Sequence, residues 1–213
     1  MTHVTRNSIQ SRPRAADTIA YTLHGNCYLN LTNRCTLRCR FCPKFNKTWE
    51  VQGYPLRLSA EPSVEQMVAA VGDAMRYREV VFCGLGEPTL RLEDLKETAR
   101  RLKIQGARVR LNTDGLANRV YGRDVTPELE GLVDAVSISL NAQDEATYAR
   151  HCRPPMSGAH AEVLDFVRRV KTHVPEVTLS AIDGLKRVDI DACREIAEEL
   201  GVHFRRRLLD RVG

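Results

Sequence analysis

The chain has 213 residues, of which 43% are hydrophobic and 28% are charged, which is ordinary for one folded domain. No apolar run reaches about 18 residues, so no membrane span is expected, and residues 1–17 lack the apolar core of a secretory signal. The net charge of +5 permits an anionic substrate or nucleic acid without requiring one. Seven cysteines, three of them clustered, favour bound metal in a reducing compartment over disulfides, so a cytoplasmic location is expected.

The first part of the chain predicts a tail and a hairpin. Residues 1–17 have little apolar content and are expected to form a disordered tail, which leaves residues 18–213 as the folded domain. Residues 18–23 and 27–32 have extended character on either side of the turn His24-Gly25-Asn26. This pattern predicts a short hairpin whose second arm is the first core strand.

The rest of the chain predicts alternating helices and strands. After an irregular connection at 52–58, Glu61-Pro62-Ser63 opens a helix with an apolar stripe at Val64, Met67, Val68, Val71 and Met75. Further strands are expected at 80–83, 109–111, 135–140, 177–182 and 202–208. Further helices are expected at 92–104, 145–149, 160–173 and 190–200, with a brief helical turn at 128–131. Six alternations predict an α/β fold of parallel units, and the length suits six units better than the eight of a full barrel.

The densest cysteine cluster lies directly after the first core strand. Cys35, Cys39 and Cys42 form a C-x3-C-x2-C pattern with Phe41 before the last cysteine. Soft thiolates that converge in this way favour an iron–sulfur cluster or zinc. The pattern has one thiol fewer than a closed zinc site or an ordinary four-iron site. We therefore expect a metal site with one position open to an exogenous ligand.

Two other interpretations of these cysteines stay open. They could be ordinary reduced cysteines, although the asparagine, arginines and lysine around them make the segment too polar for a core strand. A closed zinc site could instead borrow Cys27, Cys83 or Cys152 as its fourth ligand. In that case the chain would be a non-catalytic zinc-binding interaction module.

Polar and glycine-rich residues follow each predicted strand. After the cysteine loop come Gly84-Leu85-Gly86-Glu87-Pro88, Asn112-Thr113-Asp114-Gly115, Ser139-Leu140-Asn141 and Asp183-Gly184. Ligands of parallel sheets bind at the carboxyl ends of the strands, so these loops predict one site. Glycine exposes the backbone to a ligand, and the carboxylate of Glu87 can accept a hydrogen bond from an ammonium group. A plain strand-to-helix turn, with Glu87 near a helix N-terminus, is the alternative.

The cysteine pattern with its aromatic residue resembles the signature of the radical S-adenosylmethionine (radical SAM) superfamily. The runs Tyr-Leu-Asn-Leu-Thr-Asn-Arg-Cys (28–35) and Phe-Cys-Gly-Leu-Gly-Glu-Pro-Thr-Leu (82–90) resemble the subgroup associated with TatD-family nucleases. The resemblance covers about residues 20–207. It implies an open partial (βα)6 TIM-type barrel of parallel strands, preceded here by the short N-terminal hairpin.

The resemblance also implies the cofactors. Three irons of a [4Fe–4S] cluster would be held by Cys35, Cys39 and Cys42, and the fourth would bind the amino and carboxylate groups of S-adenosyl-L-methionine. The family segment that holds the amino group matches Gly84, Gly86 and Glu87. A polar contact to the ribose or carboxylate falls on Ser139, with Asn141, Asn112 and Thr113 as similar candidates. Arg110, on the same strand face as Asn112, could balance a carboxylate.

The contacts to adenine are matched less completely. Phe41 and Ile182 are the adenine neighbours that the resemblance implies. Relatives often carry a G-x-I-x-G-x-x-E pattern around the second of these positions. Here Ser180 replaces the first glycine and Arg187 the final acidic residue, while Gly184 is kept. The rest of that contact is therefore in doubt.

The function implied is reductive cleavage of S-adenosylmethionine to a 5′-deoxyadenosyl radical that abstracts hydrogen from an unidentified substrate. The partners implied are a reductant such as flavodoxin or ferredoxin and a functional link to a TatD-family nuclease, which would favour nucleotide or nucleic-acid chemistry. A glycyl-radical activase acting on a partner protein is the alternative enzyme. His151, Cys152 and Arg153 could bind an anion or relay a proton, although an ordinary surface loop explains them too. Arginines 205–207 would alternate between two faces of a strand, and a solvated terminus is favoured there.

Overall fold

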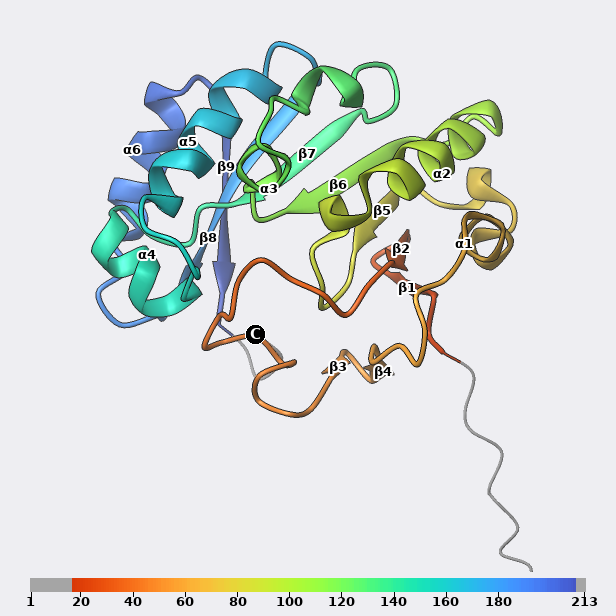
Figure 1. Cartoon of the computed structure of the whole chain (residues 1–213), viewed down its shortest axis with the longest axis horizontal. Helices are drawn as coiled ribbons and strands as arrows, with labels where there is room; N and C mark the ends of the chain where they lie inside the picture. Colours follow the sequence, from red (N-terminus) through yellow and green to blue (C-terminus); the bar gives the residue numbers. More distant parts are fainter. Residues whose placement is uncertain (1–16, 210–213) are drawn as a thin grey trace, which may run out of the picture.

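The computed structural model describes residues 17–209 (Figure 1), so the predicted tail at 1–17 lies outside the described residues except for Asp17. In this part of the chain, seven strands form the main sheet in the order β1-β2-β5-β6-β7-β8-β9. They are β1 (Ala20–Leu23), β2 (Asn26–Asn30), β5 (Val80–Cys83), β6 (Val109–Thr113), β7 (Ala135–Ser139), β8 (Glu176–Asp183) and β9 (His203–Leu208).

The sheet is parallel except at its N-terminal edge. β1 and β2 pair antiparallel, with Tyr21 opposite Tyr28 and their rings stacked at 5.3 Å. Every later neighbour, from β2–β5 to β8–β9, pairs parallel. Strands β1 and β9 are the two ends of the strand order, so the sheet does not close. The predicted fold class, an open partial barrel of six parallel strands with a hairpin before it, is confirmed.

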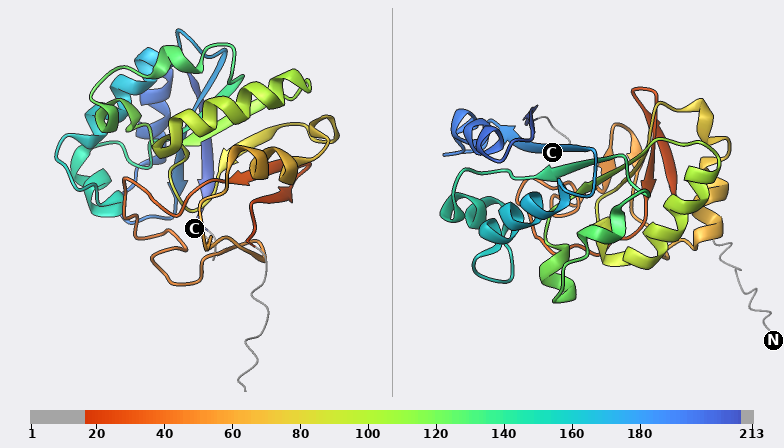
Figure 2. Two further views of the ribbon diagram at one scale, coloured as in Figure 1. Left: turned by 45° about the vertical axis from the view of Figure 1, so that its right-hand side comes forward. Right: turned by 90° about the horizontal axis from the view of Figure 1, so that it is seen from above.

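Helices follow the parallel strands and lie along the outside of the curved sheet (Figure 2). The α-helices of residues 17–209 are α1 (Val64–Val71), α2 (Leu92–Ile104), α3 (Ala117–Tyr121), α4 (Glu145–Cys152), α5 (Ala159–Val170) and α6 (Ile190–Glu199). Short 3-10 turns are η1 (Ala74–Arg76), η2 (Pro88–Arg91) and η3 (Thr126–Leu129). None of these helices is long and apolar enough to cross a membrane.

The main core lies between the sheet and the helices. Leu111 of β6 and Leu179 of β8 pack into one buried cluster with Leu95 of α2 and Phe166 of α5. Because side chains alternate along a strand, the strand residues next to these core residues point to the opposite, concave face of the sheet. That concave face carries polar side chains that are exposed or partly exposed: Arg110, Asn112, Ser139, Arg205 and Arg207.

One predicted helix is shorter than its apolar stripe suggested. Ser63 begins α1 as predicted, since its side chain and that of Gln66 form a capping box. The helix ends at Gly72, whose φ of 67° lies in the left-handed region. Asp73 then caps η1 through the amide of Met75. Met75 is 66% exposed as a result, so its predicted place in the core was wrong.

The connection predicted as irregular at 52–58 contains part of a small hairpin. Strands β3 (Glu50–Val51) and β4 (Tyr54–Pro55) pair antiparallel around Gln52 and Gly53, both of which have positive φ. Each strand has only two residues, which is too short for an alternating pattern to show in the sequence. The short helix α3 was missed for the same reason.

Candidate functional site

A cavity of about 310 Å³ lies at the carboxyl ends of the central strands. Every residue predicted for the site lines it except Ile182 and Arg110: Cys35, Cys39, Phe41, Cys42, Gly84, Gly86, Glu87, Asn112, Thr113, Ser139 and Asn141. Ile182 is 1% exposed and is paired in register with Arg207, a lining residue for which the sequence favoured a solvated terminus. The glycine-rich loop after β5 and the three thiols therefore share one end of the sheet.

The cysteine loop is held in place by the end of α4. The amide of Arg38 donates to the carbonyl of Cys152 at 3.0 Å, and the amide of Arg40 donates to the carbonyl of His151 at 2.8 Å. His151 and Cys152 are buried, and Nε2 of His151 lies 2.8 Å from the carbonyl oxygen of Lys186. The segment considered as a surface loop is therefore a buried support under the cysteines.

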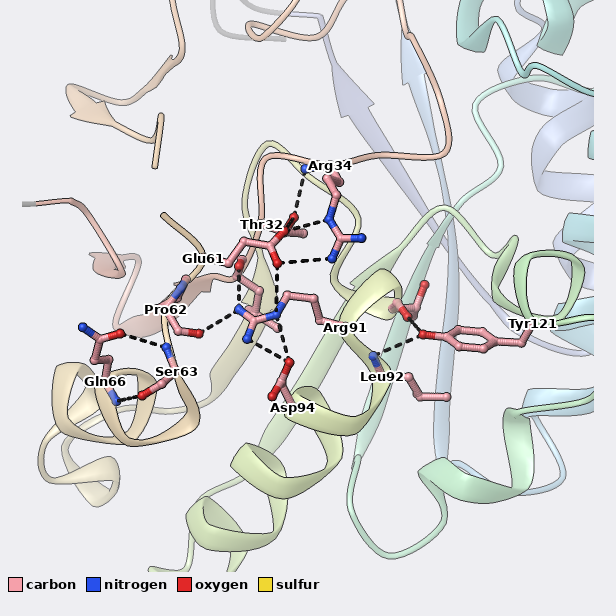
Figure 3. Close-up of polar contacts among 12 residues, drawn as sticks. Thr32, Arg34, Glu61, Pro62, Ser63, Gln66, Arg91, Leu92, Asp94 and Tyr121 are labelled. Atoms are coloured by element: carbon pink, nitrogen blue, oxygen red, sulfur yellow. Dashed lines mark hydrogen bonds and ion pairs between the residues drawn. The ribbon is translucent and has the colours of Figure 1, made fainter. Parts of the chain in front are cut away.

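The start of the cysteine loop is fixed by a polar network around Glu61 (Figure 3). Glu61 accepts hydrogen bonds from the hydroxyl of Thr32 and from Nε of Arg34 at 2.8 Å. Arg91, at the start of α2, donates to the carbonyls of Leu31 and Pro62 at 2.9 and 2.8 Å. These contacts join the end of β2 to the starts of α1 and α2, so the first residues of the loop have a defined position.

The three thiols are free and half-buried. Burial, followed by the nearby Asp114 and Glu87, raises the pKa of Cys35 to about 12. A hydrogen bond with the thiol of Cys152, followed by burial, raises the pKa of Cys39 well above its usual value. No three His, Cys, Asp or Glu side chains within residues 17–209 meet closely enough to hold a single metal ion. The thiols face one cavity as protonated groups that a metal would have to deprotonate.

The glycines after β5 allow the loop to approach the cysteine loop. A Cβ at Gly86 would lie 2.1 Å from the carbonyl oxygen of Thr32 and 2.5 Å from that of Arg34, both far inside van der Waals contact. The amide of Glu87 donates to the same Arg34 carbonyl at 2.8 Å. Gly86 is therefore required for packing between two loops as well as for access to its backbone.

Glu87 and Asp114 form a buried pair of carboxyl groups in the cavity wall. Glu87 accepts hydrogen bonds from the hydroxyl groups of Thr89 and Thr113, both at 2.8 Å, and from the amide of Asp114 at 2.8 Å. Asp114 accepts from the hydroxyl of Thr36 in the cysteine loop. Burial, and then the adjacent Asp114, raises the pKa of Glu87 to about 8. Two neighbouring buried carboxyl groups disfavour simultaneous ionisation unless a cation joins them.

Polar groups on β6 and after β7 complete the cavity wall. Nδ2 of Asn112 donates to the sulfur of Cys83 at 3.4 Å, but Oδ1 of Asn112 is buried and has no hydrogen-bond partner. Asn141 has a left-handed φ of 60°, donates to the sulfur of Cys152 and accepts from Nη2 of Arg207 at 2.8 Å. A buried acceptor without a donor is costly, so Oδ1 of Asn112 is an unsatisfied polar group among the described residues of the cavity wall.

Some candidates from the sequence lie elsewhere. Arg110, considered as a partner for a ligand carboxylate, pairs with Glu79 at 3.0 Å near the amino end of β6. Thr113 does line the cavity, but its hydroxyl donates to Glu87. Two lining residues, Asp114 and Arg207, were missed as members of the site. The sequence offered only the polar loop after β6 and the arginine run on β9 as signals for them.

A family model described as "Radical SAM superfamily" matches residues 29–200. Over 118 residues the chain is 30% identical to the probable dual-specificity RNA methyltransferase RlmN of Treponema denticola, which covers 52% of this chain and 31% of that protein. Over 163 residues it is 25% identical to the tungsten-containing aldehyde ferredoxin oxidoreductase cofactor-modifying protein of Pyrococcus furiosus, covering 73% and 42%.

A solved structure agrees on the fold. SuiB of Streptococcus suis bound to S-adenosylmethionine superimposes with a TM-score of 0.62 at 11% identity, covering 86% of this chain and 40% of that one. Identity this low supports the fold alone. The chain spans less than half the length of both curated relatives.

Proposed function

This chain belongs to the radical SAM superfamily, and from that premise we propose that it is an enzyme that generates a 5′-deoxyadenosyl radical and directs it to a substrate. Membership implies a [4Fe–4S] cluster and S-adenosylmethionine as cofactors, which together supply the radical that abstracts hydrogen. The single observation that carries the proposal is that three free thiols and the Gly84–Glu87 loop line the same cavity.

The residues of the cavity fit these cofactors. Three thiols match the ligand count of a four-iron cluster with one iron left open. The Glu87–Asp114 pair would receive the ammonium group of the methionine moiety, which would compensate two adjacent carboxylates. The unpartnered Oδ1 of Asn112 would accept a hydrogen bond from the ligand.

In this proposal the protein positions the cluster and S-adenosylmethionine and keeps water away from the reactive carbon. Cys35, Cys39 and Cys42 would hold the cluster, and the carbonyls at the end of α4 keep their loop in place. Ser139 would donate a hydrogen bond to the bound cofactor, and Phe41 would pack against its adenine. The partly enclosed cavity would keep water from the reactive carbon, which limits side reactions.

Finer assignments are part of the proposal. The subgroup associated with TatD-family nucleases is supported by the runs at 28–35 and 82–90. A nucleotide or nucleic-acid substrate is supported by the names of relatives, which include an RNA methyltransferase and a GTP 3′,8-cyclase. We also propose a flavodoxin or ferredoxin as electron donor, a cytoplasmic location, and a domain that spans 18–213.

The test is anaerobic reconstitution with iron and sulfide, followed by measurement of 5′-deoxyadenosine under reducing conditions. Wild-type protein is expected to be brown and to form 5′-deoxyadenosine, whereas Cys39→Ala should lose both the visible absorbance and the product. Cys193→Ala is the matched control, since Cys193 is buried in the core on α6, and it should keep both. Product formation by Cys39→Ala, or colourless wild-type protein with bound zinc, would contradict the proposal.

A further inference from the structure

The three consecutive arginines of β9 point to two different faces of the sheet. Arg205 pairs in register with Ser180 and Arg207 with Ile182, while Arg206 pairs with Ala181, which belongs to the helix-side core. Alternation along the strand therefore places the first and third arginines on the concave face and the second on the helix side. Arg206 forms an ion pair with Asp183 there.

Arg207 lines the cavity, and within residues 17–209 it has no counter-ion. Its Nη2 donates to Oδ1 of Asn141 at 2.8 Å, and its Nε is fully buried with no hydrogen-bond partner. No carboxylate of residues 17–209 forms an ion pair with it. Burial, and then the positive charge of Arg205, lowers its pKa to about 10, so the group stays charged at neutral pH. Arg207 is partly exposed and lines the cavity, so its charge is available to an anion that binds there.

The cavity itself does not supply that anion. The acidic residues in its wall, Glu87 and Asp114, accept hydrogen bonds from Thr89, Thr113 and Thr36 rather than from an arginine. Arg205, exposed and without an ion pair in the described part of the chain, adds a second cation two residues away.

We propose that Arg207 and Arg205 form the binding site for an oxyanion, phosphate or carboxylate, carried by the substrate. This inference rests on the proposed function, because it assigns the anion to the molecule that the radical attacks. Planar guanidinium groups bind oxyanions through paired N–H donors, and Arg207 lines the cavity and is partly exposed. Two arginines on one strand face suit a group with two or three exposed oxygens.

The position of the arginines favours the substrate over S-adenosylmethionine as the source of the oxyanion. In S-adenosylmethionine the carboxylate and the ammonium are bonded to the same carbon, so both belong near the Glu87–Asp114 pair. Those residues follow β5 and β6, whereas Arg207 lies on β9, with β7 and β8 between them in the sheet. The acidic and basic walls of the cavity therefore suit two different molecules.

The test measures binding of pyrophosphate, inorganic phosphate and succinate to the reconstituted protein by calorimetry, at constant ionic strength and with saturating S-adenosylmethionine. Wild-type protein should bind one equivalent of a probe. Arg207→Gln should weaken that binding at least tenfold and Arg205→Gln about threefold, with partial recovery in Arg207→Lys. Tighter binding of the phosphates identifies a phosphate-bearing substrate, and tighter binding of succinate a carboxylate-bearing one.

Arg206→Gln is the matched control, because it removes the same charge from the same strand on the other face. It should change the affinity less than twofold. An equal loss of probe affinity in Arg206→Gln and Arg207→Gln would show that only the net charge of the protein matters, and would overturn the inference. So would displacement of the probe by S-adenosylmethionine, which would assign the arginines to the methionine carboxylate.

The experiments can contradict the oxyanion site without contradicting the proposed radical SAM activity. Iron content and 5′-deoxyadenosine formation are measured on the same wild-type preparations. If these are absent, the proposed function is contradicted. If they are present but no probe binds saturably, only the oxyanion site is contradicted. Circular dichroism and thermal melting of each variant show that a loss of binding is not a loss of fold.

Discussion

The two ends of the sheet treat charge differently. Near the amino end, Arg110 meets Glu79 at 3.0 Å, so each charge has an opposite partner. At the carboxyl end, Glu87 lies against Asp114, and Arg207 has no carboxylate partner among the described residues. Uncompensated groups cost stability, and proteins keep them where a ligand supplies the missing partner. One end of this sheet is built for stability and the other for ligands.

The largest effect at a single pH is expected from closing the gap between two loops at the carboxyl end. Gly86→Ala places a Cβ 2.1 Å from the carbonyl oxygen of Thr32, so the loops must separate, at a cost of about 3 kcal/mol in unfolding free energy. Chemical denaturation measures this loss. Gly122→Ala is the control, because its Cβ meets nothing within 4 Å and only its φ of 63° is unfavourable, at about 1 kcal/mol. Equal losses in both variants would refute the steric explanation.

The carboxyl pair should make the stability of this end of the sheet depend on pH. The pKa of Glu87 is raised from 4.5 to about 8, so the folded protein holds its proton more tightly than the unfolded chain does. The stability from this group is fully present below about pH 4.5 and is lost as the pH rises through 8.

Glu87→Gln cannot ionise, so it should remove this loss. In cluster-free protein, the unfolding free energy of wild type relative to the variant should fall between pH 5 and 8, by at most about 1.4 kcal/mol per pH unit. Denaturation at a series of pH values measures the difference. A constant difference across that range would show that the two carboxyl groups are compensated in another way.

A change at the amino end should affect stability without affecting the ligand. Glu79→Gln breaks the ion pairs with Arg108 and Arg110, which are partly exposed, so the expected cost is about 1–2 kcal/mol. Binding of S-adenosylmethionine to the reconstituted variant should stay within twofold of wild type. Weakened binding would mean that the two ends are coupled and that the division between them is wrong.

The smallest effect concerns two serines on one strand face. Ser139 lines the cavity and Ser137, two residues earlier on β7, does not. Loss of one hydrogen bond costs about 1 kcal/mol, so Ser139→Ala should weaken S-adenosylmethionine binding about fivefold. Ser137→Ala should leave it unchanged. Equal affinity in the two variants would remove Ser139 from the proposed contacts.

The sequence predicted those parts of the site that are formed by residues close together in the chain. The cysteine spacing and the glycines after β5 are contiguous patterns, and the parallel alternation indicated that the strand ends would meet. The contacts across strands were not predictable. Asp114 meets Glu87 from 27 residues away, and Arg207 meets Asn141 from 66 residues away. Their importance depends on which side chains become neighbours, and a single sequence does not record that.

The backbone hydrogen bonds between the cysteine loop and α4 determine which side chains of the loop can be replaced during evolution. They use the amides of Arg38 and Arg40 and the carbonyls of His151 and Cys152, and every residue except proline has an amide hydrogen to donate. Related chains can therefore drift in side chain at positions 38 and 40 while the thiols stay in place. Proline, which lacks the amide hydrogen, is the one residue that we expect to be absent from positions 38 and 40 in related chains.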